Sequence, residues 1–83
     1  MSTLSDLPNI GNVLAKLLVD AGVDTPEALR KMGSKEAFIR LKMRDDTCCL
    51  HKLYALQGAV EGIRYTYLSK EMNQELKDFF NAL

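Results

Sequence analysis

The stretch from Leu7 to Leu29 constrains the fold of this chain more than any other. Apolar residues recur in it at intervals of three and four, the spacing that places side chains on one face of a helix. These residues are Ile10, Val13, Leu14, Leu17, Leu18 and Ala21. Gly22 can adopt the left-handed conformation that ends a helix, and Thr25-Pro26 has the order of an N-cap followed by a first helical proline. We therefore expect a helix that begins near Gly11, a tight turn, and a second helix.

The residues before the first helix are typical of the hairpin in a helix-hairpin-helix module. In such a module a small loop turns into a helix whose first backbone N–H groups point outward and can hold a phosphate. Ile10 would anchor the turn, and Lys16 would add a positive charge one helical turn later. The candidate phosphate- or DNA-binding residues are therefore Asn9, Ile10, Gly11, Asn12, Val13 and Lys16.

The middle of the chain contains two further segments with helical signals. One helix is expected over residues 26–32 and ends at Gly33, which tolerates the left-handed conformation. Another is expected over residues 35–43, with Ser34 as its N-cap. Its buried face comprises Ala37, Phe38 and Leu41, flanked by the basic residues Arg40, Lys42 and Arg44. Residues 45–47 (Asp-Asp-Thr) would end this helix and cap the next one.

The segment 47–62 is the most apolar part of the chain and predicts a central helix. Its apolar face comprises Cys49, Leu53, Leu56, Val60 and Ile63, widened by Leu50 and Tyr54. A second face consists of the small residues Ala55, Gly58, Ala59 and Gly62. Because each glycine inside a helix costs roughly 1 kcal/mol relative to alanine, we expect another helix to approach this face closely.

The two ends of the chain complete the expected fold. Residues 1–6 predict a short helical lead-in, with Leu4 and Leu7 packing on the first long helix. Residues 64–67 predict an irregular aromatic connector, and Ser69 predicts the N-cap of a final helix over residues 70–83. The inner face of that helix comprises Met72, Leu76, Phe79, Phe80 and Leu83. No segment has convincing strand alternation, so we expect one all-α domain over residues 1–83, a compact bundle of about five short helices.

Charge is balanced over the whole chain, with 11 basic and 11 acidic residues. The total therefore does not indicate binding to nucleic acid or to an acidic membrane. The segment from Arg30 to Arg44 is different, because it holds six basic residues and one acid, Glu36, for a local balance of +5. This segment and the aromatic connector, whose residue types are enriched at interfaces, supply the candidate partner-binding residues. They are Arg40, Lys42, Arg44, Arg64, Tyr65 and Tyr67.

Cysteine usage and hydropathy indicate in which cellular compartment the chain is expected, namely the cytoplasm. Cys48 and Cys49 are adjacent, and neighbouring helical positions point in different directions and rarely form a disulfide. No apolar run approaches the ~20 residues of a membrane span, and the first residues lack the pattern of a signal peptide. We therefore expect a cytoplasmic chain with no membrane partner.

The residue types of chemical interest do not form a recognisable catalytic or metal site. His51 is the sole histidine, and together with Cys48 and Cys49 it cannot complete a four-ligand zinc site. Cys–His catalysis also needs an orienting group and an accessible thiolate, whereas Cys49 lies on the predicted buried face and Cys48 is the more exposed of the two. Capping and surface positions explain Asp45, Asp46 and Glu61. We expect no enzyme activity, no catalytic residue, no metal, no cofactor and no small-molecule substrate.

Four segments together resemble the C-terminal domain of TfoX/Sxy-type proteins. They are Leu-Pro-Asn-Ile-Gly at 7–11, Ala-Gly-Val-Asp-Thr-Pro-Glu-Ala-Leu at 21–29, Ala-Phe-Ile-Arg-Leu at 37–41 and Leu-Tyr-Ala-Leu-Gln-Gly-Ala-Val-Glu-Gly-Ile-Arg-Tyr at 53–65. The last segment is the most specific, and the resemblance covers almost the whole chain. It implies a small helical domain with a helix-hairpin-helix-like or SAM-like arrangement. In two-domain relatives this domain accompanies an N-terminal domain in a regulator of DNA uptake and natural competence, whereas here it is expected to stand alone.

Two functions are consistent with these observations. Binding of the DNA backbone through the hairpin requires the basic segment from Arg30 to Arg44 to lie on the hairpin's side, because one lysine neutralises little phosphate charge. A protein-interaction module, including one that self-associates, needs no charge that the sequence lacks. We therefore favour contacts with a protein partner or a second copy in a regulatory context, with nonspecific DNA-backbone binding as the alternative.

Overall fold

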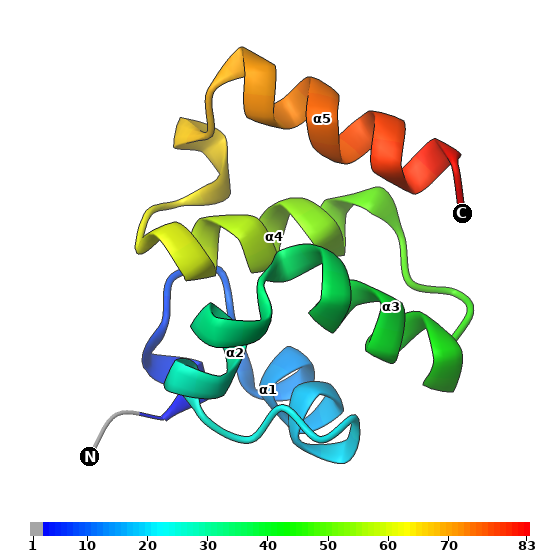
Figure 1. Cartoon of the computed structure of the whole chain (residues 1–83). Helices are drawn as coiled ribbons and strands as arrows, with labels where there is room; N and C mark the ends of the chain where they lie inside the picture. The colour runs from blue at the N-terminus through cyan, green and yellow to red at the C-terminus, as the bar shows by residue number, and fades with distance from the viewer. Residues whose placement is uncertain (1–2) are drawn as a thin grey trace.

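The computed structural model describes residues 3–83, and all of the regular structure in this range is helical (Figure 1). Two 3-10 helices are η1 (Leu4–Asp6) and η2 (Tyr65–Tyr67). The α-helices are α1 (Asn12–Asp20), α2 (Pro26–Met32), α3 (Ser34–Arg44), α4 (Leu50–Glu61) and α5 (Lys70–Asn81). The all-α class with about five short helices is confirmed. Residues 1 and 2 of the expected lead-in lie outside the described range, and residues 4–6 form a 3-10 turn that buries Leu4.

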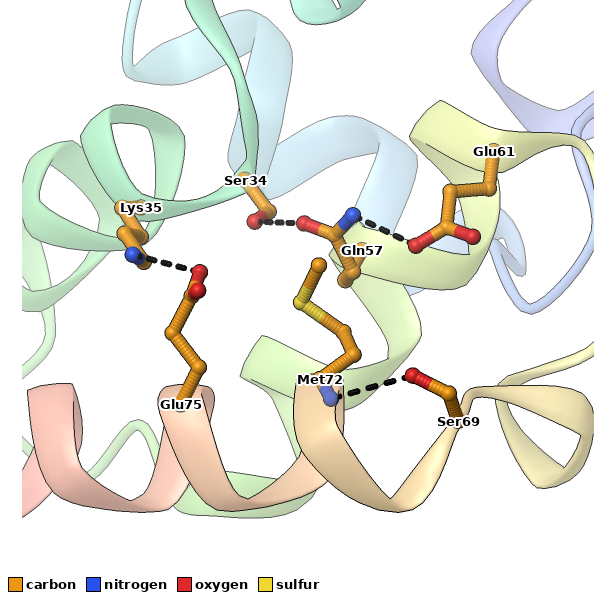
Figure 2. A network of polar contacts seen from close by, with 7 residues as sticks. All are labelled: Ser34, Lys35, Gln57, Glu61, Ser69, Met72 and Glu75. Atoms are coloured by element: carbon orange, nitrogen blue, oxygen red, sulfur yellow. Dashed lines mark hydrogen bonds and ion pairs between the residues drawn. The ribbon is translucent and has the colours of Figure 1, made fainter.

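Short-range capping signals placed several helix boundaries correctly. The Thr25 side chain accepts a hydrogen bond of 3.0 Å from the backbone N–H of Ala28, and α2 ends at Gly33, whose φ is 88°. The Ser69 hydroxyl accepts a hydrogen bond of 3.1 Å from the backbone N–H of Met72 at the start of α5 (Figure 2). These boundaries agree with the prediction because each signal lies within a few residues of the helix end that it sets.

The start of α3 differs from the prediction. Gly33 serves both as the C-cap of α2 and as the N-cap of α3, so Ser34 is the first helical residue and not a cap. Ser34 is buried, and its hydroxyl donates to the side-chain oxygen of Gln57, whose amide donates in turn to the Glu61 carboxylate at 2.6 Å (Figure 2). The Ser34 hydroxyl therefore links α3 to α4.

The start of α4 also differs, with a larger consequence. Residues 45–47 form a turn in which Asp45 accepts hydrogen bonds from the Thr47 backbone and hydroxyl, and α4 begins only at Leu50, with Cys49 as its N-cap. The expected exposure of the two cysteines is therefore wrong: Cys48 is buried and Cys49 is exposed. Cys48 precedes the helix, so helical periodicity does not apply to it.

The central position of α4 is confirmed. It lies between α5 on one side and α3 on the other, and its buried residues include Leu53, Leu56 and Ala59 (Figure 1). The largest fully buried side chains come from all parts of the chain: Leu18, Val23, Pro26, Leu29, Phe38, Leu41, Leu53, Leu56 and Leu76. None of the helices in the described range is long and apolar enough to span a membrane.

Two further residues expected in the core lie at the surface. Val13 is 77% exposed, because the buried stripe of α1 consists of Leu14 and Leu18, and Val13 points about 100° away from Leu14. Leu83 is exposed because α5 ends at Asn81, two residues before it. The expected buried positions of Ala37, Phe38 and Leu41 on α3 are confirmed.

Candidate functional site

The predicted hairpin is held to the end of α4 by the side chain of Asn9. The Asn9 amide nitrogen donates to the carbonyl oxygens of Ile63 at 2.9 Å and Ala55 at 3.4 Å, and its Oδ1 accepts from the backbone N–H of Tyr65 at 3.0 Å. Asn9 has a φ of 70°, a left-handed conformation that asparagine tolerates better than most residues. We call these hydrogen bonds the Asn9 clasp. They direct the Asn9 amide into the protein, away from any ligand at the hairpin.

Gly58 provides the space for the clasp. A β-carbon at Gly58 would lie 2.4 Å from Asn9 Nδ2 and 2.8 Å from the carbonyl oxygen of Ile63. At Gly58 the close approach is therefore made by Asn9, Ile63 and Tyr65, and not by another α-helix as expected. The close neighbours are the hairpin and the chain that turns back after α4, which reverses at Gly62 with a φ of 76°. Figure 1 shows the blue segment before α1 reaching the yellow end of α4.

The first turn of α1 faces outward, as the hairpin prediction required. Ile10 is buried and anchors the turn, while Gly11, Asn12, Val13 and Lys16 are exposed. No side chain within residues 3–83 caps the N-terminus of α1. Lys16 is the one cation that the α1 sequence supplies, so α1 itself adds little positive charge to this surface.

The basic residues Arg40 and Arg44 lie at the opposite end of α1 from the hairpin. Both line a hollow with Ala21, the residue that directly follows α1, and a β-carbon at Gly22 would lie 3.6 Å from Arg40 Nη1. Because α1 has nine residues, about 13 Å of helix separates the two surfaces. The hairpin and these arginines therefore do not form one positively charged surface.

The exposed side of α3 carries a stripe of residues at helical spacing. The stripe consists of Glu36, Ile39, Arg40, Met43 and Arg44, which line a hollow of about 390 Å³ together with Ala21. Met43 is 82% exposed. A second hollow, of about 360 Å³, adjoins the first at Glu36 and Arg40 and is lined further by Ala28, Lys31 and Met32 from α2. We call the two adjoining hollows the α3 groove.

Lys42 lies apart from the two arginines with which it was grouped. Its Nζ is 5.7 Å from the centroid of the Phe80 ring on α5, so it faces α5 and not the α3 groove. Lys35 faces the same way and forms an ion pair of 2.8 Å with Glu75 on α5 (Figure 2). The basic residues of α3 are thus divided between two of its sides, because residues two apart on a helix point in nearly opposite directions.

The candidate residues of the aromatic connector adjoin the hairpin. Arg64, Tyr65 and Thr66 line a hollow of about 420 Å³ together with Pro8 and Asn9. Tyr65 is half-buried and packs edge to face on His51, with ring centroids 4.7 Å apart. Arg64 is exposed, and Tyr67 is 73% exposed. Of the predicted partner-binding residues, Arg64 and Tyr65 therefore lie beside the hairpin. Arg40 and Arg44 lie in the α3 groove.

The cysteines and the histidine have separate environments. The backbone N–H of Lys52 lowers the pKa of the exposed Cys49 thiol, whereas burial raises the pKa of the Cys48 thiol. His51 packs on Tyr65. In the described part of the chain no group of three or more His, Cys, Asp or Glu side chains is placed to hold a metal ion.

Sequence reasoning missed the apolar half of the α3 groove. Ile39 and Met43 share the face of Arg40 and Arg44 at offsets of three and four, so their spacing could have revealed the stripe. Ala21, Ala28 and Met32 come from other helices, and only the tertiary structure brings them beside α3.

Comparison with known proteins gives the chain a family. The sequence profile described as TfoX C-terminal domain matches residues 1–80. Protein Sxy of Escherichia coli (strain K12) is 32% identical over 80 residues, which cover 96% of this chain but 38% of that protein. A crystal structure of an uncharacterized protein from Listeria monocytogenes, in a triclinic form, has a TM-score of 0.97 and 48% identity, covering 98% of this chain and 92% of that one. A tetragonal form of a Listeria monocytogenes protein of unknown function has a TM-score of 0.93 and 49% identity, covering 95% and 96%. The chain therefore belongs to the TfoX C-terminal domain family.

Proposed function

We propose that this chain is a cytoplasmic, non-enzymatic protein-binding domain that serves a regulator, in the competence-related setting that the TfoX/Sxy resemblance implies. The observation that carries the proposal is the exposed α3 groove. Its methionine and isoleucine lie beside Arg40 and Arg44, and within residues 3–83 neither arginine forms an ion pair. Methionine and arginine are enriched at protein interfaces, and charge that is not neutralised within a domain favours a complementary partner.

DNA binding by the hairpin has weaker support. Nonspecific affinity for DNA depends on several cations that neutralise phosphates, and the hairpin surface offers two, Lys16 on α1 and Arg64 beside Pro8 and Asn9. Arg40 and Arg44 lie at the other end of α1, and the Asn9 amide is engaged in the clasp. The hairpin therefore combines a suitable backbone geometry with too little charge.

Two parallel assays test the proposed function. The immobilised full chain and its Arg40→Glu/Arg44→Glu variant are exposed to a bacterial extract, and proteins retained by the wild type alone are identified, purified and titrated against the chain. A short labelled DNA duplex is titrated with the same chain at low and moderate salt, with Lys16→Glu as the variant. Light scattering gives the mass of each protein.

We expect a purified partner that binds the wild type and the Lys16→Glu variant alike and loses affinity for Arg40→Glu/Arg44→Glu. A mass above the monomer that the arginine changes reduce would identify a second copy as that partner. Salt-sensitive duplex binding that Lys16→Glu abolishes, with no retained protein, would replace the proposal with DNA-backbone binding.

A further inference from the structure

The α3 groove has the length and position to receive one helix. Its floor follows α3, which has 11 residues and is therefore about 16 Å long, equivalent to three helical turns. The C-terminal end of α1 and the outer side of α2 border it through Ala21 and Ala28. The small side chains at these two borders leave room beside α3.

The floor of the groove is apolar and adaptable. Met32, Ile39 and Met43 supply most of its apolar side chains, and two of the three are methionines, whose unbranched side chains adjust to different partners. Grooves of this kind bind an amphipathic helix through apolar side chains at positions i, i+3 or i+4, and i+7. Ile39 and Met43 are themselves one helical turn apart, which suits such spacing.

The charge of the groove selects an acidic partner. Lys31, Arg40 and Arg44 line it, against one carboxylate, Glu36, so the net charge along the groove is +2. Arg40 and Arg44 are four residues apart and project along one line of α3. Carboxylates at the same interval on a bound helix would therefore face both guanidinium groups.

Among the helices of residues 3–83 none has the acidic and apolar pattern that the groove requires, so a second copy of this chain is a poor occupant. The helix with an acidic exposed face is α5, and the hollow on that face is lined by Lys70, Glu71, Gln74, Glu75 and Asp78, all polar. The apolar residues of α5 face the core: Leu76 is buried, and Met72, Phe79 and Phe80 are partly buried against it. DNA fits less well, since the groove has an apolar floor and a carboxylate at its centre.

We infer that the α3 groove binds an acidic amphipathic helix of a partner protein, with apolar side chains on Ile39 and Met43 and carboxylates at Arg40 and Arg44. This inference rests on the proposed function and specifies the chemistry of the partner.

A peptide selection tests the inference without a known partner. A phage-displayed library of random peptides about 16 residues long, roughly four helical turns, is selected against the full chain. The enriched peptides are sequenced and synthesised with a fluorescent label, and their affinities are measured by anisotropy. Their helix content when bound is measured by circular dichroism.

Three variants locate the binding surface. Arg40→Glu/Arg44→Glu reverses two charges in the groove, and Met43→Asp places a charge on its floor at a side chain that is already exposed. Lys70→Glu/Lys77→Glu makes the same change in net charge on α5 and serves as the matched control. Thermal unfolding of each variant verifies that the domain is folded.

We expect acidic peptides with apolar residues at i, i+3 or i+4, and i+7, which lose at least about tenfold in affinity with either groove variant and less than about twofold with the control. Failure to enrich any peptide, or enrichment of peptides without acidic residues, would overturn the inference. Peptides that bind every variant equally would show that the binding surface is not the α3 groove. That result would overturn this inference but not the proposed function of protein binding. Duplex DNA binding in the absence of both peptide and protein binding would remove both proposals.

Discussion

Two junctions of the domain, one between the hairpin and α4 and one between α3 and α5, are held in different ways. At the C-terminal end of α4 the Asn9 clasp uses directed hydrogen bonds to backbone groups around a glycine that leaves no spare volume. Along the α3–α5 contact, the polar link is an ion pair between Lys35 and Glu75, whose side chains are 42% and 55% exposed. The clasp is specific and intolerant of change, whereas the ion pair lies in water and is replaceable.

The α3–α5 contact is held by apolar surface instead. Leu76 is fully buried, and the rings of Phe38 and Phe80 lie 5.9 Å apart at an interplanar angle of 57°. The Lys35 ammonium lies 5.6 Å from the Phe79 ring centroid, at an exposed site where such contacts are weak. Comparing the two junctions indicates where polar contacts stabilise this domain. They contribute to the free energy of unfolding where they satisfy partly buried backbone groups, and contribute little at the surface.

Gly58→Leu should cause the largest loss of stability, about 3 kcal/mol or more, because the new side chain would displace both Asn9 and the backbone of Ile63. Urea denaturation gives the change in the free energy of unfolding. Gly11→Ala is the matched control, since a β-carbon there meets nothing within 4 Å, and we expect it to cost less than about 1 kcal/mol. Equal losses of unfolding free energy at the two glycines would show that the Asn9 clasp can adjust to a side chain at Gly58 at little cost.

Leu76→Ala should cost about 3 kcal/mol, because it removes a fully buried side chain and leaves a cavity between α5 and the core. Thermal and urea unfolding measure the loss, and α5 should lose protection from amide hydrogen exchange first. The exposed residue Leu83 provides the control, with a cost of less than about 0.5 kcal/mol for Leu83→Ala. A mild effect of Leu76→Ala would mean that polar links hold α5 after all.

Asn9→Ala should cost about 2 kcal/mol, because it leaves the N–H of Tyr65 and the carbonyl of Ile63 without their partner. Asn9→Gly should be less harmful by about 1 kcal/mol, since glycine adopts the left-handed conformation without strain. Combining Asn9→Ala with Gly58→Leu should give less than the sum of the two losses, because both changes break one contact. If the two losses of stability simply added, Gly58 and the Asn9 clasp would be energetically independent.

Lys35→Gln combined with Glu75→Gln should have the smallest effect, less than about 0.5 kcal/mol, because the pair is exposed and screened by salt. Urea denaturation at low and moderate salt measures it. A loss as large as that of Asn9→Ala would erase the distinction between the two junctions.

Sequence alone predicted the features that short-range signals determine. The bounds of α2, the capping role of Ser69 and the buried face of α3 follow from residues within one or two turns of each other. The burial of Ile10 and the exposure of Gly11, Asn12 and Val13 also agree with the local pattern.

The errors arose where distant residues decide the outcome. From the sequence, Asn9 is only a candidate ligand-binding residue and its structural role is not predicted, because its partners lie 46, 54 and 56 positions away, beyond the reach of any local pattern. The exposure of Cys48 and Cys49 was reversed because the turn at residues 45–47 delays the start of α4. The α3 groove could be predicted in part, since its stripe follows helical spacing, but its borders on α1 and α2 depend on packing.

The clasp closes a ring of the chain that leaves α5 outside it. Its most distant partner is the backbone N–H of Tyr65, so every group that the clasp needs precedes α5. Local unfolding of α5 alone would therefore leave all of these hydrogen bonds formed, and the hairpin would stay attached to α4.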